Sequence, residues 1–318
     1  MKILVYNCRE DETEFFNKYS QEHEVKIKLT SQSPNLENAQ LAAGFDCLSI
    51  ITTKIDKNLL AKYSKLGIKY ISTRTIGYDH IDLKNAKKYK IGIGNISYSP
   101  DSVAEYTVML ILMSIRKMEL ILSRSKVQDY SLSKLRGREL HNLTIGIIGT
   151  GRIGKAILKK LNSFGCRLLA YDLNPDQKNK LAEYVDLNQL IKKSDIISLH
   201  VPATKENKHL ISQERLALMK KNSYIINTAR GSLIDTSALI DALEQKKIAG
   251  AALDVIENEA NIYYKDFKGE VISNHELAIL RSLPNVILTP HTAFFTRQAV
   301  SDMIENSILN CINYLEKN

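Results

Sequence analysis

The stretch Leu143–Gly154, LTIGIIGTGRIG, decides the fold of this chain of 318 residues. An apolar, β-branched run leads directly into a glycine-rich turn, and a helical pattern follows. This order of strand, turn and helix is the context that the G-x-G-x-x-G fingerprint of dinucleotide-binding domains requires. We expect Gly149 to permit the turn, Gly151 to let the backbone approach a pyrophosphate, and Gly154 to let helix and strand pack closely. The predicted phosphate-binding residues are Gly149, Thr150, Gly151, Arg152, Ile153 and Gly154.

An acidic residue follows the next strand-like run, where a ribose-binding acid is expected. That run, Arg167–Tyr171, ends at Asp172, eighteen residues past Gly154. A carboxylate at this position accepts hydrogen bonds from the ribose hydroxyls and repels a 2′-phosphate. The sequence therefore predicts NAD, rather than NADP, as the cofactor.

Strand and helix signals alternate along most of the chain, which is typical of parallel sheets covered by helices. The chain is also longer than one hydrophobic core usually supports. We predict an α/β protein with two Rossmann-like, doubly wound parallel-sheet domains separated by a cleft. Residues 1–99 and 296–318 are expected to form a flavodoxin-like substrate domain, and residues 100–295 the NAD-binding Rossmann domain. Ligands of such sheets bind outside the carboxyl ends of the strands.

The expected elements follow from these signals. In the first domain, short strands are predicted at Ile3–Tyr6, Val25–Leu29, Cys47–Ile51, Lys69–Ser72 and Ile91–Asn95, and helices at Glu12–Tyr19, Asn35–Ala42, Lys57–Ser64 and Asp82–Tyr89. In the second domain, six strands are predicted at Thr144–Ile148, Leu168–Tyr171, Ile196–Leu199, Tyr224–Asn227, Gly250–Leu253 and Val286–Leu288. A further helix is expected over Thr296–Leu315, returning to the first domain.

A long helix is expected between the two alternations, from Pro100 to about Ser125, with Ser99 or Asp101 as its cap. Its centre, Val108–Met113, is continuously apolar. Such a helix must be buried between domains or against another subunit. We therefore predict a homodimer.

The bulk properties are those of an ordinary globular protein. No run reaches the ~18 to 20 apolar residues that span a bilayer, and charges follow the first apolar run too early for a signal peptide. We thus expect a cytoplasmic protein without a membrane partner. The formal charge of +9 comes from dispersed lysines rather than a basic block, which favours a solvated surface that steers anions over a nucleic-acid partner. The four scattered cysteines form no C-x-x-C pair and are interpreted as reduced packing thiols, and no metal site is predicted.

Polar residues follow three consecutive strands of the second domain. Arg230 comes after the run ending at Asn227, Asp254 and Glu259 come after Leu253, and His291 comes after Leu288. Because the carboxyl ends of parallel strands meet at one edge of the sheet, an arginine, acids and a histidine are expected together there. Each residue alone has a structural explanation, such as an ion pair or a packing histidine; their joint occurrence favours an active site.

These segments resemble the D-isomer-specific 2-hydroxyacid dehydrogenase family. Its motifs N-x-x-R-G, L-D-V-x-x-x-E and P-H-x-A correspond to Asn227–Gly231, Leu253–Glu259 and Pro290–Ala293. The resemblance covers nearly the whole chain and includes the glycine turn, Ser198–Pro202, and Ser99–Pro100 with Ala104–Glu105. It implies an NAD-dependent oxidoreductase that reversibly reduces a 2-oxo acid to the D-2-hydroxy acid.

The resemblance also implies the roles of individual residues. Arg230 matches the residue that binds the substrate carboxylate and carbonyl, His291 the acid–base, and Glu259 its partner. Ile76 and Gly77, in the loop Thr75–Asp79, match a loop whose backbone N–H groups hold the substrate carboxylate. The further residues expected to bind the cofactor are Val201, Pro202, Thr228, Ala229 and Asp254, whereas His200 is expected to line the cofactor pocket or support its loop without being catalytic.

Three aromatic residues resemble those that surround the substrate side chain in the D-lactate and D-2-hydroxyisocaproate dehydrogenase branch. They are Tyr98, Phe294 and Phe295. Pyruvate and 2-oxoisocaproate both stay open as substrates. Formate is disfavoured because formate-acting members carry Gln where this chain has Glu259. A hydroxypyruvate or glyoxylate reductase and an NAD-sensing binding protein of the same fold are the alternatives. Asp172 disfavours an NADP-preferring reductase, and the Arg–Glu–His set disfavours pure binding.

Overall fold

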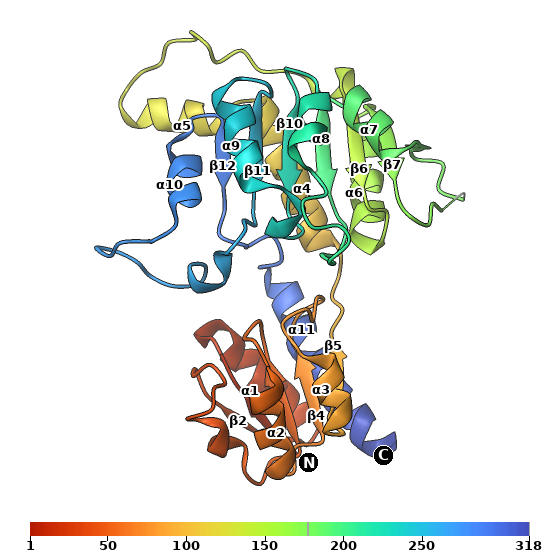
Figure 1. Ribbon diagram of the computed structural model, residues 1–318, viewed down its shortest axis with the longest axis vertical. Coiled ribbons are helices and arrows are strands. Elements are labelled where there is room, and N and C mark those ends of the chain that lie inside the picture. The colour runs from red at the N-terminus through yellow and green to blue at the C-terminus, as the bar shows by residue number, and fades with distance from the viewer. Residues whose placement is uncertain (177, 318) are drawn as a thin grey trace. The chain divides into compact units, whose positions relative to one another are not determined.

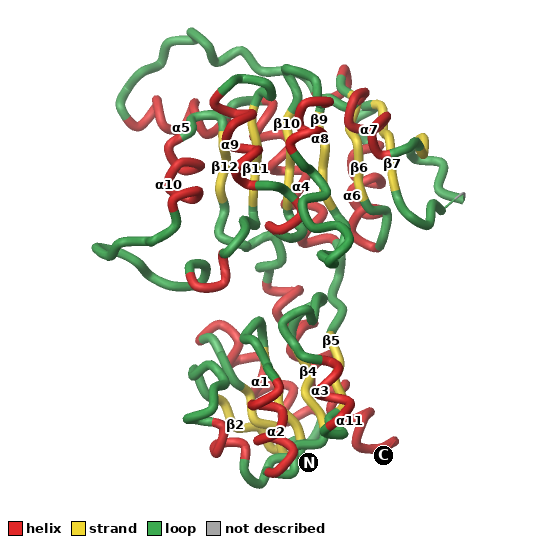
Figure 2. The backbone as a smooth tube through the Cα atoms, in the orientation of Figure 1, coloured by secondary structure: helices red, strands yellow, loops and turns green. Residues whose placement is uncertain are grey.

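The computed structural model describes residues 1–176 and 178–317 (Figures 1 and 2). The chain divides into two compact units. One contains residues 1–99 and the chain from residue 295 onward, and the other contains residues 100–294. Each unit has a fully parallel sheet with helices on both faces, so the predicted fold class is confirmed.

The sheet of the first unit has five strands in the order β2-β1-β3-β4-β5, which is the flavodoxin-like order. Its strands are β1 (Lys2–Val5), β2 (Lys26–Leu29), β3 (Cys47–Ile50), β4 (Tyr70–Thr73) and β5 (Gly92–Asn95). The helices α2 (Lys57–Lys65) and α3 (Leu83–Lys88) cover one face, where Leu60 and Tyr63 enter the core. The helices α1 (Thr13–Glu22) and α11 (Arg297–Lys317) cover the other face, with Phe16 and Ile304 in the core. The helix predicted over Asn35–Ala42 is wrong, because only the 3-10 turn η2 (Ala39–Ala42) forms there.

The sheet of the second unit has seven strands in the order β12-β11-β10-β9-β6-β7-β8. They are β6 (Thr144–Ile148), β7 (Arg167–Tyr171), β8 (Glu183–Tyr184), β9 (Ile196–Leu199), β10 (Tyr224–Asn227), β11 (Gly250–Leu253) and β12 (Val286–Leu288). The strand order reverses beside β6, and this reversal is where Rossmann sheets bind dinucleotides. The sequence missed β8, because two residues are too short a run to show alternation.

Helices cover both faces of this sheet. On one side α4 (Asp101–Ile115) and α6 (Arg152–Asn162) share a core cluster with the strands. On the other side lie α7 (Leu187–Lys193), α8 (Gln213–Leu218), α9 (Thr236–Glu244) and α10 (His275–Ser282). The apolar centre of α4 is therefore explained largely by packing within its own unit.

The long helix predicted from Pro100 to Ser125 is broken in two. After α4, Lys117 adopts a left-handed conformation with φ of 54°, and α5 (Met118–Lys126) begins afresh. The returning backbone closes the end of α4: Arg138 N donates to Ile115 O at 3.0 Å, and a Cβ on Gly137 would lie 2.8 Å from that oxygen. The predicted cap is also wrong, because Pro100, rather than Ser99 or Asp101, occupies the N-cap position.

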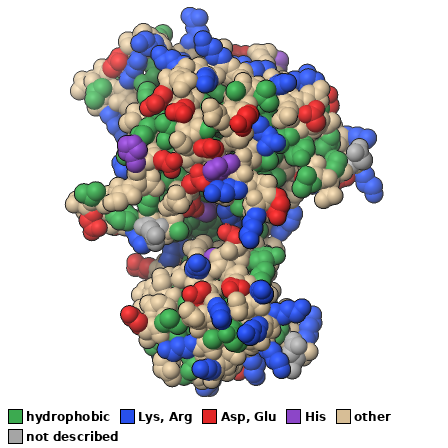
Figure 3. Space-filling model, in the orientation of Figure 1, with side chains coloured by type: hydrophobic (Ala, Val, Ile, Leu, Met, Phe, Trp, Pro, Cys, Tyr) green, Lys and Arg blue, Asp and Glu red, His purple; other side chains and the backbone are tan. Residues whose placement is uncertain are grey.

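Two surface properties bear on the sequence-based expectations. On the face that Figure 3 shows, lysine and arginine side chains are scattered among acidic and apolar ones rather than gathered in a single patch. Within residues 1–176 and 178–317, no helix is both long and apolar enough to cross a membrane.

Candidate active site and dinucleotide-binding turn

The glycine turn after β6 has the shape that a pyrophosphate needs. Gly149 has a φ of 95°, and a Cβ there would lie 2.6 Å from the carbonyl oxygen of His200. A Cβ on Gly154 would clash with the carbonyl oxygen of Gly149, so the first turn of α6 packs directly on the backbone of the turn. At Gly151, by contrast, no heavy atom of the described residues, apart from the glycine and its two chain neighbours, lies within 4 Å of the position that a Cβ would take. The open side of the turn, at the N-terminus of α6, thus fits the phosphates of a dinucleotide.

Asp172 stands directly after β7 and is tied to this turn. Its Oδ2 accepts hydrogen bonds from Thr150 N at 2.6 Å and Thr150 Oγ1 at 3.1 Å, and its Oδ1 accepts one from Asn174 N at 2.9 Å. Burial raises the pKa of Asp172, but these hydrogen bonds outweigh it and hold the pKa below its usual value. The carboxylate therefore stays ionised. Since a carboxylate has about four acceptor sites, it can still accept from a ribose hydroxyl.

The segment after β9 supports the glycine turn from the other side. Val201 Cγ1 would lie 2.8 Å from a Cβ on Gly149, so it contacts the turn, and the Pro202 carbonyl accepts from Asn207 Nδ2 at 2.6 Å. His200 Nε2 lies 2.8 Å from Ser198 Oγ. Desolvation lowers the pKa of His200 to about 3, so this imidazole is neutral near pH 7. A ring that resists protonation is unsuited to a general acid.

Glu259 and His291 form the central pair at the carboxyl edge of the sheet. His291 Nδ1 lies 2.5 Å from Glu259 Oε1, and Glu259 Oε2 accepts from Ile256 N at 2.9 Å. With both carboxylate oxygens engaged, Glu259 fixes the orientation of the ring through Nδ1. Asn258 and His291 both have left-handed backbones, with φ of 61° and 55°. Such conformations cost free energy in residues other than glycine and are concentrated at functional sites.

Asp254 follows β11, is fully buried, and accepts the hydrogen bonds that hold the segment around His291 in place. Its Oδ1 accepts from Thr289 Oγ1 at 2.6 Å and Thr292 N at 2.9 Å, and its Oδ2 accepts from Ala293 N at 2.9 Å. The carbonyl oxygen of Asp254 accepts from His291 N at 2.8 Å. The sequence predicted Asp254 as a cofactor-binding residue but did not predict these hydrogen bonds. Its contact with the cofactor stays a prediction.

Arg230 lies in a turn that Asn227 closes. Asn227 Nδ2 donates to the Arg230 carbonyl at 2.9 Å, and Asn227 Oδ1 accepts from Ala229 N at 3.0 Å. Arg230 Nη1 donates to the Ala229 carbonyl at 2.7 Å. A Cβ on Gly231 would clash with the carbonyl group of Ile256, so the turn packs on the segment that leads to Glu259. This contact brings the Arg230 turn and the Glu259 segment together and explains the glycine of the N-x-x-R-G motif.

Thr228, the remaining residue of this turn with an assigned role, faces α4. Its Oγ1 lies 2.9 Å from Thr107 Oγ1. Sequence reasoning missed Asn227 as a turn-closing residue, although its place in the motif was a signal. It also missed Tyr264, which donates from its hydroxyl to the His291 carbonyl at 2.8 Å and whose ring lies 6.1 Å from the imidazole. Tyr264 lies in a stretch without periodicity, which gave no signal.

The aromatic residues predicted at the substrate lie in different places. Phe294, in the second unit, places its ring edge-on 6.4 Å from the His291 imidazole. Phe295 belongs to the first unit, where its ring lies 5.3 Å from the Arg9 guanidinium. Tyr98 is half-buried in the segment that follows β5. The structure thus places Phe294 beside the imidazole.

Ile76 and Gly77 lie in the loop that follows β4 in the first unit. Asn95 Nδ2 donates to the Ile76 carbonyl at 2.6 Å, and Thr75 Oγ1 donates to the Gly77 carbonyl at 2.6 Å. The Thr75 carbonyl accepts from Ile96 N at 3.2 Å. Because a trans peptide points its C=O and the next N–H in opposite directions, these bonds also fix the directions of the Ile76 and Gly77 N–H groups.

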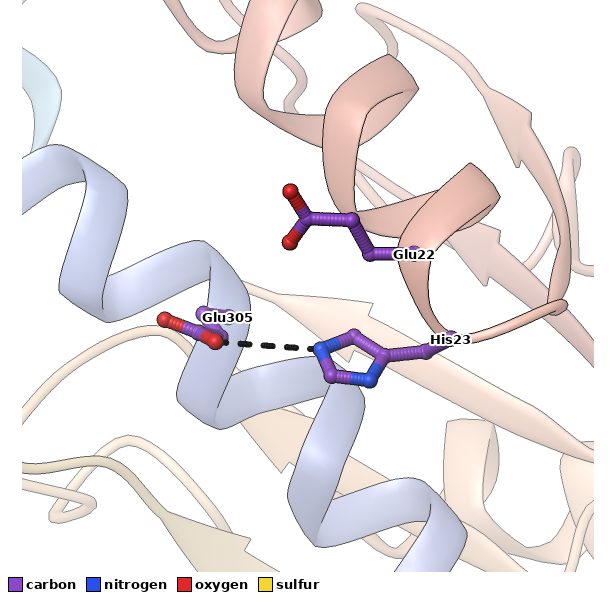
Figure 4. A group of neighbouring side chains, drawn as sticks. All are labelled: Glu22, His23 and Glu305. Carbon is purple, nitrogen blue, oxygen red and sulfur yellow. Dashed lines mark ion pairs between the residues drawn. The ribbon is translucent and has the colours of Figure 1, made fainter.

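One group of side chains in the first unit has the composition of a metal site. Glu22 ends α1, His23 follows it directly and Glu305 lies on α11, and their ligand atoms are within 4.8 Å of one another (Figure 4). His23 Nε2 lies 3.8 Å from Glu305 Oε1, which is an ion pair when the imidazole is protonated. These residues join the first and last helices of the unit and include none of the residues predicted to be catalytic.

Comparisons with known proteins agree with this geometry. The model of the NAD-binding domain of D-isomer specific 2-hydroxyacid dehydrogenases matches residues 108–293. A D-specific alpha-keto acid dehydrogenase of Enterococcus faecalis is 42% identical over 99% of this chain and 97% of the relative. An aromatic 2-oxoacid reductase of Clostridium sporogenes is 42% identical over 98% of this chain and 95% of the relative.

A solved structure of D-2-hydroxyisocaproate dehydrogenase superposes on the chain with a TM-score of 0.91 and 33% identity, covering 100% of this chain and 97% of the other. Two full-length relatives, a solved structure and a family model that spans more than half of the chain lead to the same assignment. That assignment agrees with the geometry of the glycine turn, of Asp172 and of the Glu259–His291 pair. The chain belongs to the D-isomer-specific 2-hydroxyacid dehydrogenase family and is an NAD-dependent oxidoreductase.

Proposed function

We propose that this enzyme reduces a small 2-oxo acid with an apolar side chain to the D-2-hydroxy acid, with pyruvate and 2-oxoisocaproate as the leading substrates. The observation that carries the proposal is the Glu259–His291 pair, held at the same sheet edge as Arg230. When bound, NADH supplies the hydride that reaches the carbonyl carbon. The names of the similar proteins support a 2-oxo acid as the substrate class.

Arg230 binds the substrate. A 2-oxo acid presents a carboxylate next to a ketone, and the planar guanidinium can donate to both in parallel. The same donors stabilise the negative charge that develops on the ketone oxygen as the carbonyl carbon is reduced. Arg230 is half-buried, and the turn closed by Asn227 fixes the start of its side chain.

His291 transfers the proton. In reduction, protonated His291 gives its Nε2 proton to the ketone oxygen, which completes the hydroxyl group and leaves a neutral imidazole. In oxidation the neutral ring takes the same proton back. Glu259 stabilises the imidazolium and keeps the Nδ1 proton in place. Ile76 and Gly77 donate their backbone N–H groups to the substrate carboxylate.

The cofactor residues also stay a proposal at the level of single contacts. The turn Gly149–Gly154 binds the pyrophosphate through its N–H groups, and Asp172 accepts from the ribose. Val201, Pro202, Thr228, Ala229 and Asp254 line the rest of the cofactor site. The open space at Gly151 and the ionised state of Asp172 support these roles.

The test is a substrate panel. We expect the protein to oxidise NADH with pyruvate, 2-oxoisocaproate or phenylpyruvate, and to prefer NADH to NADPH. Phenylpyruvate is included because one relative is an aromatic 2-oxoacid reductase. Equal inactivity on all three acids, with NADH bound normally, would contradict the proposal and favour the NAD-sensing alternative. Faster turnover of hydroxypyruvate or glyoxylate would favour the other alternative.

We further propose that the enzyme acts as a cytoplasmic homodimer. The support lies in α5 and the segment after it, where apolar side chains are exposed in the single chain. They include Leu122, 47% exposed, Val127, 75% exposed, and Leu132, 86% exposed. Large apolar side chains exposed along one segment favour an interaction surface there. Light scattering at micromolar concentration should give twice the chain mass, and a monomeric mass would contradict the proposal.

A further inference from the structure

A completely buried ion pair lies beneath the loop Thr75–Asp79 of the first unit. Arg74, the residue before this loop, and Glu12, in the turn before α1, are both 0% exposed. Arg74 Nε donates to Glu12 Oε1 at 3.3 Å, and Arg74 Nη2 donates to Glu12 Oε2 at 3.3 Å. Burying two charges costs free energy that a well-packed apolar pair would not, so stability alone does not explain the pair.

The guanidinium of Arg74 donates hydrogen bonds to three segments: the turn that contains Glu12, the residues that follow β1, and β3. Its Nη2 also donates to the carbonyl oxygens of Tyr6, at 3.1 Å, and Asn7, at 3.3 Å, where the chain leaves β1. Its Nη1 donates to Ser49 Oγ, on β3, at 3.0 Å. The planar fork of arginine can satisfy such a set of acceptors, whereas the ammonium of lysine cannot reach them all. Arg74 thus fastens the start of the loop to the carboxyl edge of β1 and β3.

The loop itself is exposed although its anchor is buried. Ile76 is 38% exposed and Tyr78 is 44% exposed, in contrast to Arg74. The middle of the loop is held at the Ile76 carbonyl by Asn95 Nδ2. Its far end is held by the hydrogen bond of Ile55 N to the His80 carbonyl at 2.9 Å. At its start, the loop is held by two backbone hydrogen bonds, from Arg74 N to the Ile50 carbonyl at 2.8 Å and from Ile96 N to the Thr75 carbonyl at 3.2 Å. The Arg74 side chain adds a further anchor there, from the buried side.

We infer that Arg74 and Glu12 are positioning residues, which hold the backbone N–H groups of Ile76 and Gly77 in place for the substrate carboxylate. This inference rests on the proposed role of that loop. Both side chains are fully buried, so they act through the loop rather than by touching substrate. A loosened loop should weaken substrate binding, and displacements of about 1 Å in positioning groups can change rates up to ~10²-fold.

Two serines offer a matched pair of variants. Ser49 Oγ and Ser307 Oγ lie 2.8 Å apart, and both residues are buried, but the bond to Arg74 comes from Ser49. Ser49→Ala and Ser307→Ala therefore both remove the hydrogen bond between the serines, while the first also removes an acceptor from Arg74. We expect Ser49→Ala to raise KM for the 2-oxo acid about threefold, because a hydrogen bond to a charged group is lost. Ser307→Ala should leave KM within about twofold of wild type.

A second pair separates positioning from stability. Arg74→Lys should raise KM for the 2-oxo acid by about tenfold, with kcat less affected and the Kd for NADH unchanged. Leu60→Ala is the control, because Leu60 on α2 packs in the core of the same unit, so the variant lowers stability but removes no hydrogen bond of Arg74. Hydrogen–deuterium exchange of the amides of residues 75–79 gives a readout independent of turnover, and it should be faster in Arg74→Lys than in Leu60→Ala.

The outcomes are distinct. Equal KM values for the two serine variants, or equal KM and exchange changes in Arg74→Lys and Leu60→Ala at a matched loss of Tm, would overturn the inference. If Arg74→Lys does not fold, the serine pair decides by itself. If the wild type reduces no 2-oxo acid, the proposed function fails, while the exchange measurement still decides whether Arg74 holds the loop.

Discussion

The carboxyl edges of the two sheets differ in how their charged side chains are arranged. At the edge of the seven-stranded sheet, reactive side chains come out into the site: Glu259 and His291 pair directly, and the Arg230 turn packs on the Glu259 segment. At the edge of the five-stranded sheet, the charged groups Glu12 and Arg74 are buried, and the loop that follows Arg74 exposes Ile76, Tyr78 and Asp79. From this contrast we expect the first edge to perform chemistry and the second edge to supply binding. Mutations in the two should then act on different kinetic constants.

The largest effect is expected from His291→Ala. Removing the proton donor should lower kcat by about 10²-fold or more, because general acid–base catalysis contributes that much. The Kd for NADH, measured by fluorescence titration, should stay near the wild-type value. The control is His200→Gln, which changes a neutral histidine of the same unit and should retain most of kcat. Comparable loss of turnover in both variants would remove the distinction between them.

A smaller effect, on both KM and kcat, is expected from Arg230→Lys. Lysine keeps the charge but loses the planar fork, so the variant should both raise KM for the 2-oxo acid and lower kcat. Arg138→Lys is the matched control, because Arg138 pairs with Asp195 elsewhere in the same unit. Wild-type steady-state kinetics for Arg230→Lys would mean that Arg230 is a structural residue.

The glycine turn gives a prediction in which binding and stability separate. Gly151→Ala adds a methyl group into open space, so Tm should hardly change while the Kd for NADH rises about tenfold or more, because the backbone no longer approaches the phosphates. Gly154→Ala forces a clash with the Gly149 carbonyl, so it should lower Tm even without cofactor. Isothermal titration calorimetry and thermal unfolding measure the two effects. Unchanged NADH affinity in Gly151→Ala would argue against the pyrophosphate at this turn.

The smallest effect concerns pH. The pKa of His200 is lowered to about 3 by desolvation in the folded protein, while in the unfolded chain it returns to its ordinary value near 6.5. As the pH is lowered, His200 therefore takes up a proton in the unfolded chain before it does so in the folded protein. The free energy of unfolding then falls as the pH drops below about 6.5. Relative to its own Tm at pH 7, His200→Gln should lose less Tm at pH 5 than the wild type does. An identical pH dependence of Tm would show that His200 is accessible to protonation in the fold.

The same contrast between the edges explains what the sequence could predict. Periodicity and the glycine fingerprint predicted both parallel sheets, because the strands are short, apolar and separated by clear turn signals. The candidate set Arg230, Glu259 and His291 could be proposed from the sequence because each of the three follows a strand, so topology alone brings them to one edge. Strand ends are a local signal, and local signals are readable in a sequence.

Contacts between distant segments were not readable in this way. Glu12 and Arg74 are 62 positions apart, and no local pattern links a charge before a helix to a charge after a strand. The break at Lys117 was missed for a similar reason, since it depends on Gly137 and Arg138 returning to the end of α4. Asp254 was expected at the cofactor, whereas its three hydrogen bonds to residues 289–293 became visible only in the fold.

The central claim is that this protein transfers hydride and a proton to a 2-oxo acid with D stereochemistry, using His291 as the proton donor. The most direct measurement is chiral chromatography of the 2-hydroxy acid formed from pyruvate or 2-oxoisocaproate with NADH, run in parallel with wild type and His291→Ala. We expect the D isomer from the wild type and about 10²-fold less product from the variant. Formation of the L isomer, or equal product from both proteins, would contradict the claim.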